Sequence, residues 1–99
     1  MVRYKQIYLD AFGLDTTDFI ACEVSGQRAI DFHHIIGRGK KGEDRVENLM
    51  ALTRVNHIKY GDKKKYMVFL FNTHRNYLSD NGVKFDNNWF EEKINYYEV

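Results

Sequence analysis

The sequence predicts a small α+β fold, a single domain over residues 1–99, with a β, β, α core at about 19–62, a helix before it and further helices after it. Three observations lead to this fold class. At 99 residues the chain is long enough for one core and too short for two. A composition of 43% hydrophobic and 15% aromatic residues supplies ample apolar material. Finally, two runs that favour strands flank a short Gly-containing turn, between segments with helical spacing.

The first expected element is an amphipathic helix over residues 3–12. Its apolar side chains follow the spacing i, i+3, i+4, i+7 and i+8, at Tyr4, Ile7, Tyr8, Ala11 and Phe12. Gly13 follows directly and is placed to end the helix. We expect this helix to act as scaffold.

A β-hairpin is expected next. The runs FIACEV (19–24) and RAIDFHHI (28–35) flank SGQ, which is typical of a hairpin with a short turn. The segment GRGKKGEDRVE (37–47) has no regular period and predicts an exposed loop. The chain then returns to an apolar run, NLMALT (48–53), that suits a strand.

The rest of the chain is expected to be helical. Thr53 is a candidate N-cap and Gly61 a candidate end for a first short helix, and Asp62 is a candidate N-cap for the next. A turn at SDNG precedes an aromatic-rich terminal helix whose expected role is packing. The helical segments are 54–61, 62–78 and 89–97.

Composition also limits where the chain is expected to work. No apolar run approaches the length of a membrane span, and the first residues lack the pattern of a secretory signal, so we expect a cytoplasmic protein without a membrane partner. Cys22 is the single cysteine and cannot form an internal disulfide, in agreement with a reducing compartment. We expect it to be a small buried residue.

The net charge of +1 hides an uneven distribution along the chain. Residues 1–36 carry three Lys or Arg against five Asp or Glu, residues 37–65 carry nine against four, and residues 66–99 carry three against five. Positive charge in the middle segment suits an anionic substrate, although a solvated surface explains it equally well. Residues expected to contact phosphates are Arg38, Lys40, Lys41, Arg54, Lys59, Lys63, Lys64 and Lys65.

Two adjacent histidines, His33 and His34, end the second run of the hairpin. Successive side chains of a strand point to opposite faces, so the two cannot easily be equivalent ligands of one ion. His57, on the short helix, can instead share a divalent ion with His33, with water and substrate oxygens completing its coordination. His34 is then free to act as general base, since the ordinary histidine pKa of about 6.5 suits proton transfer near neutral pH.

Two further residues are expected to support this site. Asp31 lies two residues before His33 and so on the same face, where its carboxylate can hold the imidazole of a ligand in one orientation. Asn48 lies fourteen residues after His34 and is placed to hydrogen-bond the loop backbone. We expect His74 to be a packed or exposed histidine and Trp89 to be a core residue.

The ordered set His33-His34, Asn48 and His57 resembles the HNH endonucleases, whose ββα-metal motif is shared with colicin DNases and many phage nucleases. The resemblance covers about residues 22–62. It implies that His33 and His57 are metal ligands, that His34 is the general base, and that Asn48 is the structural asparagine of the motif. Some members add a ligand one helical turn after the helix histidine, and here that position is Gly61.

Many members of that family also hold a structural zinc between two CxxC pairs. The corresponding positions here are Cys22, Ser25, Thr53 and Asn56, so one thiol of four remains. We therefore expect no structural zinc.

The resemblance implies a DNA endonuclease that uses one divalent ion, Mg, Mn, Ni or Zn, and leaves a 5′ phosphate and a 3′ hydroxyl. The alternative is a nucleic-acid-binding module that kept the fold and lost catalysis. Retention of His34 argues against this alternative, because a binding module needs no base. A purely structural zinc module is disfavoured by the missing cysteines.

Overall fold

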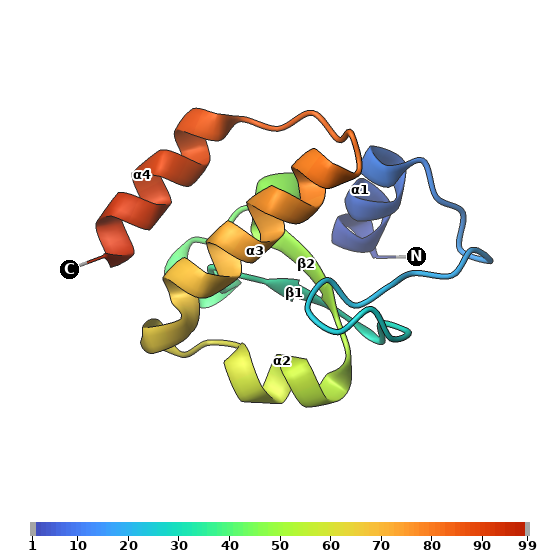
Figure 1. Cartoon of the computed structure of the whole chain (residues 1–99), viewed down its shortest axis with the longest axis horizontal. Coiled ribbons are helices and arrows are strands. Elements are labelled where there is room, and N and C mark those ends of the chain that lie inside the picture. Colours follow the sequence, from blue (N-terminus) through green and yellow to red (C-terminus); the bar gives the residue numbers. More distant parts are fainter. Residues whose placement is uncertain (1, 99) are drawn as a thin grey trace.

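The computed structural model describes residues 2–98 and confirms an α+β fold (Figure 1). Its main elements are α1 (Arg3–Phe12), β1 (Asp31–His34), β2 (Leu49–Leu52), α2 (Arg54–Tyr60), α3 (Met67–Asp80) and α4 (Asn87–Tyr97). Single turns of 3-10 helix lie at Arg38–Lys40, Val46–Asn48 and Lys64–Tyr66. In Figure 1, α3 crosses in front of the two strands, α1 and α4 lie toward opposite ends, and α2 lies below.

β1 and β2 form an antiparallel pair in which both faces of β2 are covered. Leu49 and Ala51 pack with Tyr8 of α1 in a small cluster, while Met50 and Leu52 belong to the main core with α3 and α4. This alternation follows from the period of two in a strand. All four residues of β2 are buried, as expected for a strand between two layers.

The expected hairpin before β1 is only partly formed. Segments 19–24 and 28–30 share a single bridge, between Ala21 and Arg28, and the partner of β1 is β2 instead. The chain turns directly after Cys22, where Gly26 N donates to Cys22 O. This turn lets the side chain of Glu23 enter the interior, so no regular ladder continues along residues 19–24.

The predicted capping of α2 is confirmed and that of the next helix is wrong. The Thr53 side chain accepts a hydrogen bond from Asn56 N, and α2 ends before Gly61. Asp62, however, adopts a left-handed conformation with φ of 58°, whereas an N-cap residue is extended. Lys63 donates to the carbonyls of Ile58 and Lys59 at the end of α2, and α3 begins only at Met67.

Helix α1 has the predicted bounds and ends at Gly13, whose φ of 66° suits glycine. Helix α4 begins at Asn87, and its N-cap is Asp86. Among residues 2–98, none of the helices is both long enough and apolar enough to cross a bilayer.

Candidate metal centre

His33 and His34 lie on opposite faces of the sheet, as strand alternation predicts. His33 is opposite Met50, which belongs to the main core, whereas His34 is opposite Leu49, on the side of α1. The His34 ring accordingly packs edge-on against Tyr4 of α1, with 4.7 Å between ring centroids. The two neighbours therefore have different surroundings and can have different chemical roles.

The structure brings His33 and His57 together. Their ring centroids are 4.6 Å apart, although 24 residues separate them in sequence. His33 is only 4% exposed, and its Nε2 is buried without a hydrogen-bond partner among the described residues. A buried polar atom without a partner costs about 1 to 3 kcal/mol, so this nitrogen indicates a place where a ligand can bind.

Burial and, after it, the charge of the nearby His57 lower the pKa of His33 to about 4. The His33 imidazole is therefore neutral at physiological pH and its lone pair is available. A neutral imidazole is the form that binds metal ions.

Asp31 contacts the second imidazole of the pair. Its Oδ2 lies 2.9 Å from His57 Nδ1, and Arg54 donates two hydrogen bonds to the same carboxylate at 2.7 and 2.8 Å. The hydrogen bonds from Arg54, followed by that from His57, lower the Asp31 pKa to about 2. A carboxylate at Nδ1 favours the proton on that nitrogen, which leaves Nε2 of His57 as the lone-pair site.

Gly61 packs closely against both imidazoles. A Cβ at this position would lie 2.9 Å from His57 Cδ2 and 3.3 Å from His33 Cε1, and only 2.5 Å from His57 O. No side chain fits there without moving the histidines. The position one turn after His57 thus cannot supply a further ligand, and close packing explains the glycine.

The two histidines fit a divalent ion held by two protein ligands. His57 lines a shallow pocket of about 470 Å³ together with Asp31, Arg54, Ile58, Gly61 and Asp62. Over residues 2–98, no cluster of three or more His, Cys, Asp and Glu side chains is arranged to hold a metal. Water or substrate oxygens would have to provide the remaining coordination, as in an open site.

His34 forms a hydrogen bond with a carboxylate that the sequence did not indicate. Its Nε2 lies 2.7 Å from Asp44 Oδ1, and Arg38 donates to the same carboxylate at 2.7 and 3.2 Å. The hydrogen bonds from Arg38 and then His34 lower the pKa of Asp44. In the neutral ring, a proton on Nε2 shared with Asp44 leaves Nδ1 as the basic atom.

Asn48 holds the ends of the loop between the strands. Its Oδ1 accepts from Ile36 N at 2.8 Å, and its Nδ2 donates to the carbonyls of Ile36 and Glu43, each at 3.0 Å. The residue is fully buried. It fixes the chain directly after β1, in agreement with its predicted contact with loop backbone, and contacts neither metal-site histidine directly.

The predicted phosphate contacts fall into three groups. Arg38 and Arg54 are paired with carboxylates at the site, and Lys63 caps α2. The ammonium groups of Lys59 and Lys65 lie about 5.1 Å from the rings of neighbouring tyrosines. Lys40, Lys41 and Lys64 are exposed and have no ion-pair partner within the described part of the chain.

A buried polar network near the site was missed from the sequence. His74 Nδ1 lies 2.7 Å from Glu23 Oε1, His74 Nε2 lies 2.6 Å from Val46 O, and Tyr8 donates to Glu23 Oε2 at 2.8 Å. Burial alone lowers the pKa of His74, but the Glu23 charge and hydrogen bond raise it overall. These contacts join α1, the turn after Cys22 and α3, so the network is structural.

The four positions where the resemblance implied a lost zinc site take part in hydrogen bonds instead. Asn56 Nδ2 lies 3.5 Å from Cys22 Sγ, and Thr53 caps Asn56 N. Cys22 is buried, as expected, and burial raises its pKa, but hydrogen bonds from Ser25 and nearby backbone lower it to about 7 overall. Hydrogen bonds thus connect the segment before β1 to α2.

No family model, no curated protein and no solved structure matches the chain. The resemblance to HNH endonucleases therefore stays a prediction, and the case for a function depends on the site itself.

Proposed function

We propose that this protein is a metal-dependent DNA endonuclease that hydrolyses phosphodiester bonds. The observation that carries the proposal is the pairing of His33, whose buried Nε2 has no partner, with His57, whose tautomer is set by Asp31. A single Mg, Mn, Ni or Zn ion held by these imidazoles would stabilise negative charge on the phosphate. The predicted basic residues around the site suit a polyanionic substrate.

In this proposal His34 accepts the proton of the attacking water at Nδ1. Asp44 holds the opposite ring nitrogen and stabilises the imidazolium that forms, in the way a carboxylate orients a catalytic histidine. Asn48 is a positioning residue, because it fixes the backbone that follows His34. Arg38 keeps Asp44 ionised and thereby supports the same role.

The second candidate is a nucleic-acid-binding module without catalysis. It is favoured by the enclosure of His34, whose side chain is only 12% exposed between Tyr4 and Asp44. A substrate must reach this ring if His34 is to act as a base. Both candidate functions predict binding to DNA, and only the endonuclease predicts that the DNA is cleaved.

A plasmid-nicking assay separates them. We expect nicking with an added divalent ion, none with a chelator, and none for a His33→Ala, His57→Ala double variant. The control is Gln27→Ala, which changes an exposed residue outside the site and leaves the buried network intact. Binding without nicking under every metal condition would favour the binding module.

DNA affinity gives a second test. Each phosphate contact contributes about −0.9 to the slope of log affinity against log salt on duplex DNA. A Lys64→Glu, Lys65→Glu variant should weaken binding to unrelated sequences alike. Lys63 is left unchanged because it also caps α2.

A further inference from the structure

A cleft runs between the loop after β1 and helix α4. It has a volume of about 650 Å³ where Lys40, Lys41 and Glu43 face Trp89, Lys93 and Tyr96. A second hollow of about 410 Å³ shares Ile36, Lys40, Tyr96 and Tyr97 with the first, so the two are parts of one groove.

The groove leads to the metal centre. Its second hollow is also lined by Asp62, which lines the pocket beside His57. Asp44, the partner of His34, lies in the same loop as the groove residues Lys40 and Glu43. A chain that lies in the groove can therefore continue to the candidate site.

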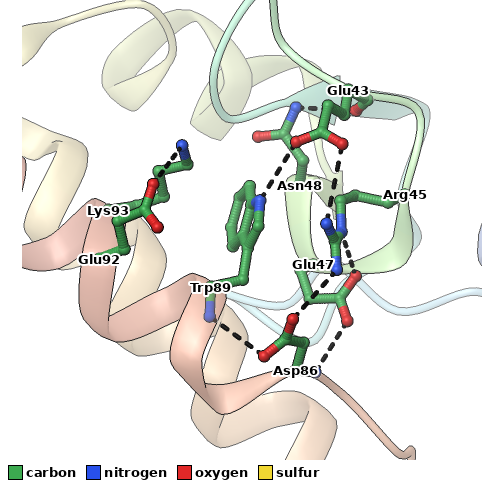
Figure 2. Close-up of polar contacts among 8 residues, drawn as sticks. All are labelled: Glu43, Arg45, Glu47, Asn48, Asp86, Trp89, Glu92 and Lys93. Atoms are coloured by element: carbon green, nitrogen blue, oxygen red, sulfur yellow. Dashed lines mark hydrogen bonds and ion pairs between the residues drawn. The ribbon is translucent and has the colours of Figure 1, made fainter.

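The groove has a rigid wall on the side of α4. Trp89 donates from Nε1 to Glu43 at 3.4 Å, and Arg45 joins Glu43, Glu47 and Asp86 with separations of 2.9 to 3.7 Å (Figure 2). These contacts fasten the start of α4 to the loop.

Tyr96 is the exposed aromatic of this groove. Tyr96 as a residue is 71% exposed, whereas Trp89 is 8% exposed and has Arg45 and Lys93 near its ring. Tyr97 packs edge-on against Tyr96, with 4.9 Å between ring centroids, and contacts Phe71 of the core. Tyr96 therefore offers a supported aromatic surface, in contrast to the packing role that was expected of the aromatic-rich terminal helix.

The charges identify the occupant. Lys40, Lys41 and Lys64 are exposed and have no ion-pair partner among residues 2–98. Of the lining carboxylates, Glu43 and Glu92 are engaged with neighbouring residues, and Asp62 is the one without an ion pair among the described residues. An aromatic surface flanked by unpaired lysines matches a chain of bases and phosphates. A duplex would instead present its bases stacked and covered.

We propose that this groove binds unpaired nucleotides of DNA beside the scissile phosphate, with a base stacked on Tyr96 and phosphates held by Lys40, Lys41 and Lys64. The proposal deepens the proposed function and relies on it for the position of the cut. The substrate class is then DNA with a single-stranded segment next to the cleavage site, such as a flap or an overhang.

Binding is tested on the full chain in a chelator, so that it does not depend on metal. Trp89 is the only tryptophan and lines the groove, so its fluorescence responds to binding there. We expect a short oligothymidine to quench its fluorescence, and Tyr96→Ala to weaken binding by about 5-fold to 150-fold, the range for loss of one stacked base. Phe19→Ala is the matched control, since Phe19 is another exposed aromatic and does not line the groove.

Cleavage is tested on a flap and on a blunt duplex of the same sequence. We expect wild type to prefer the flap and Tyr96→Ala to lose this preference while still cutting the duplex. Equal loss of oligothymidine affinity in Phe19→Ala and Tyr96→Ala, or unchanged affinity in Tyr96→Ala, would overturn the groove proposal. Tyr96-dependent binding without metal-dependent cleavage of either substrate would instead reject the endonuclease and keep the groove as a binding site.

Discussion

His33 and His74 are both buried histidines, but their surroundings differ in one respect. His74 has a partner at each ring nitrogen, Glu23 and Val46 O, whereas Nε2 of His33 has none among the described residues. His74 is fully buried in the interior. His33 instead packs against His57, and His57 lines a surface pocket. A satisfied buried histidine stabilises the fold, and an unsatisfied one indicates a site that a ligand completes.

This difference also separates the two carboxylates next to these histidines. Glu23 has no exposed side-chain surface, and it joins three segments through Tyr8 and His74. Asp31 is partly exposed and orients His57 while held by Arg54. The first carboxylate is a structural residue, and the second prepares an imidazole for another partner.

The largest expected effect is on catalysis at His34. If the proposed function holds, His34→Ala should lower the cleavage rate by about 10² to 10⁴ and leave metal affinity nearly unchanged, because His34 faces α1, on the opposite side of the strand from His33. Nicking kinetics and calorimetric metal titration measure the two effects. Collapse of metal affinity in this variant would reverse the roles given to His33 and His34.

The next effect is on stability, through the buried polar network of Tyr8, Glu23 and His74. His74→Leu should lower the free energy of unfolding by about 3 to 5 kcal/mol, because it leaves Glu23 buried without its charged partner. Urea denaturation measures this change. A loss below about 1 kcal/mol would mean that the network does not hold the fold as described.

The pH dependence of stability should differ between the two histidines. Because the His33 pKa is about 4 in the folded chain, the unfolded chain binds more protons between about pH 6.5 and 4, and stability falls as the pH drops through this window. The loss is about 3 kcal/mol. The raised pKa of His74 has the opposite sign, since its contribution is complete below about pH 6.5 and is lost as the pH rises through the folded pKa.

The contribution of His33 is obtained by subtracting the pH profile of a His33→Leu variant from that of the wild type. Denaturation of wild type and His33→Leu across the pH range, in a chelator, should show that the decline between pH 6.5 and 4 is reduced in the variant. An identical pH profile for both chains would contradict the low pKa of His33.

The smallest effect is the stability of His33→Leu itself near neutral pH. Removing a buried nitrogen that lacks a partner should leave the metal-free protein equally stable or raise its stability by about 1 kcal/mol. The matched comparison is His74→Leu under the same conditions. Equal destabilisation by both substitutions would remove the distinction between the sites.

Local patterns were sufficient to predict several elements. The apolar spacing gave the bounds of α1, Thr53 marked the start of α2, and alternation in a strand placed His33 and His34 on opposite faces. These features depend on neighbouring residues, which a sequence displays directly. The proximity of His33 and His57 also followed, because a strand and the helix after the next strand meet in a β, β, α unit.

Other features depend on contacts between distant segments. Glu23 and His74 are 51 residues apart, and neither has a local feature that identifies its partner. Asp44 lies in a loop without regular period, so its contact with His34 could not be foreseen. The predicted strand at 19–24 is not formed, because the chain turns after Cys22 and Glu23 points inward. Asp62 is not the N-cap of the next helix, because its backbone is left-handed.

The central claim, that His33 and His57 together bind one divalent ion, is tested most directly by following the histidine ring nitrogens by NMR during zinc titration. We expect the Nε2 signals of His33 and His57 to shift together and saturate at one ion per chain, while both His74 nitrogens stay unchanged. The His33→Ala, His57→Ala double variant should retain no stoichiometric zinc by elemental analysis. Unchanged His33 signals at saturating zinc, or tightly bound zinc in the double variant, would contradict the claim.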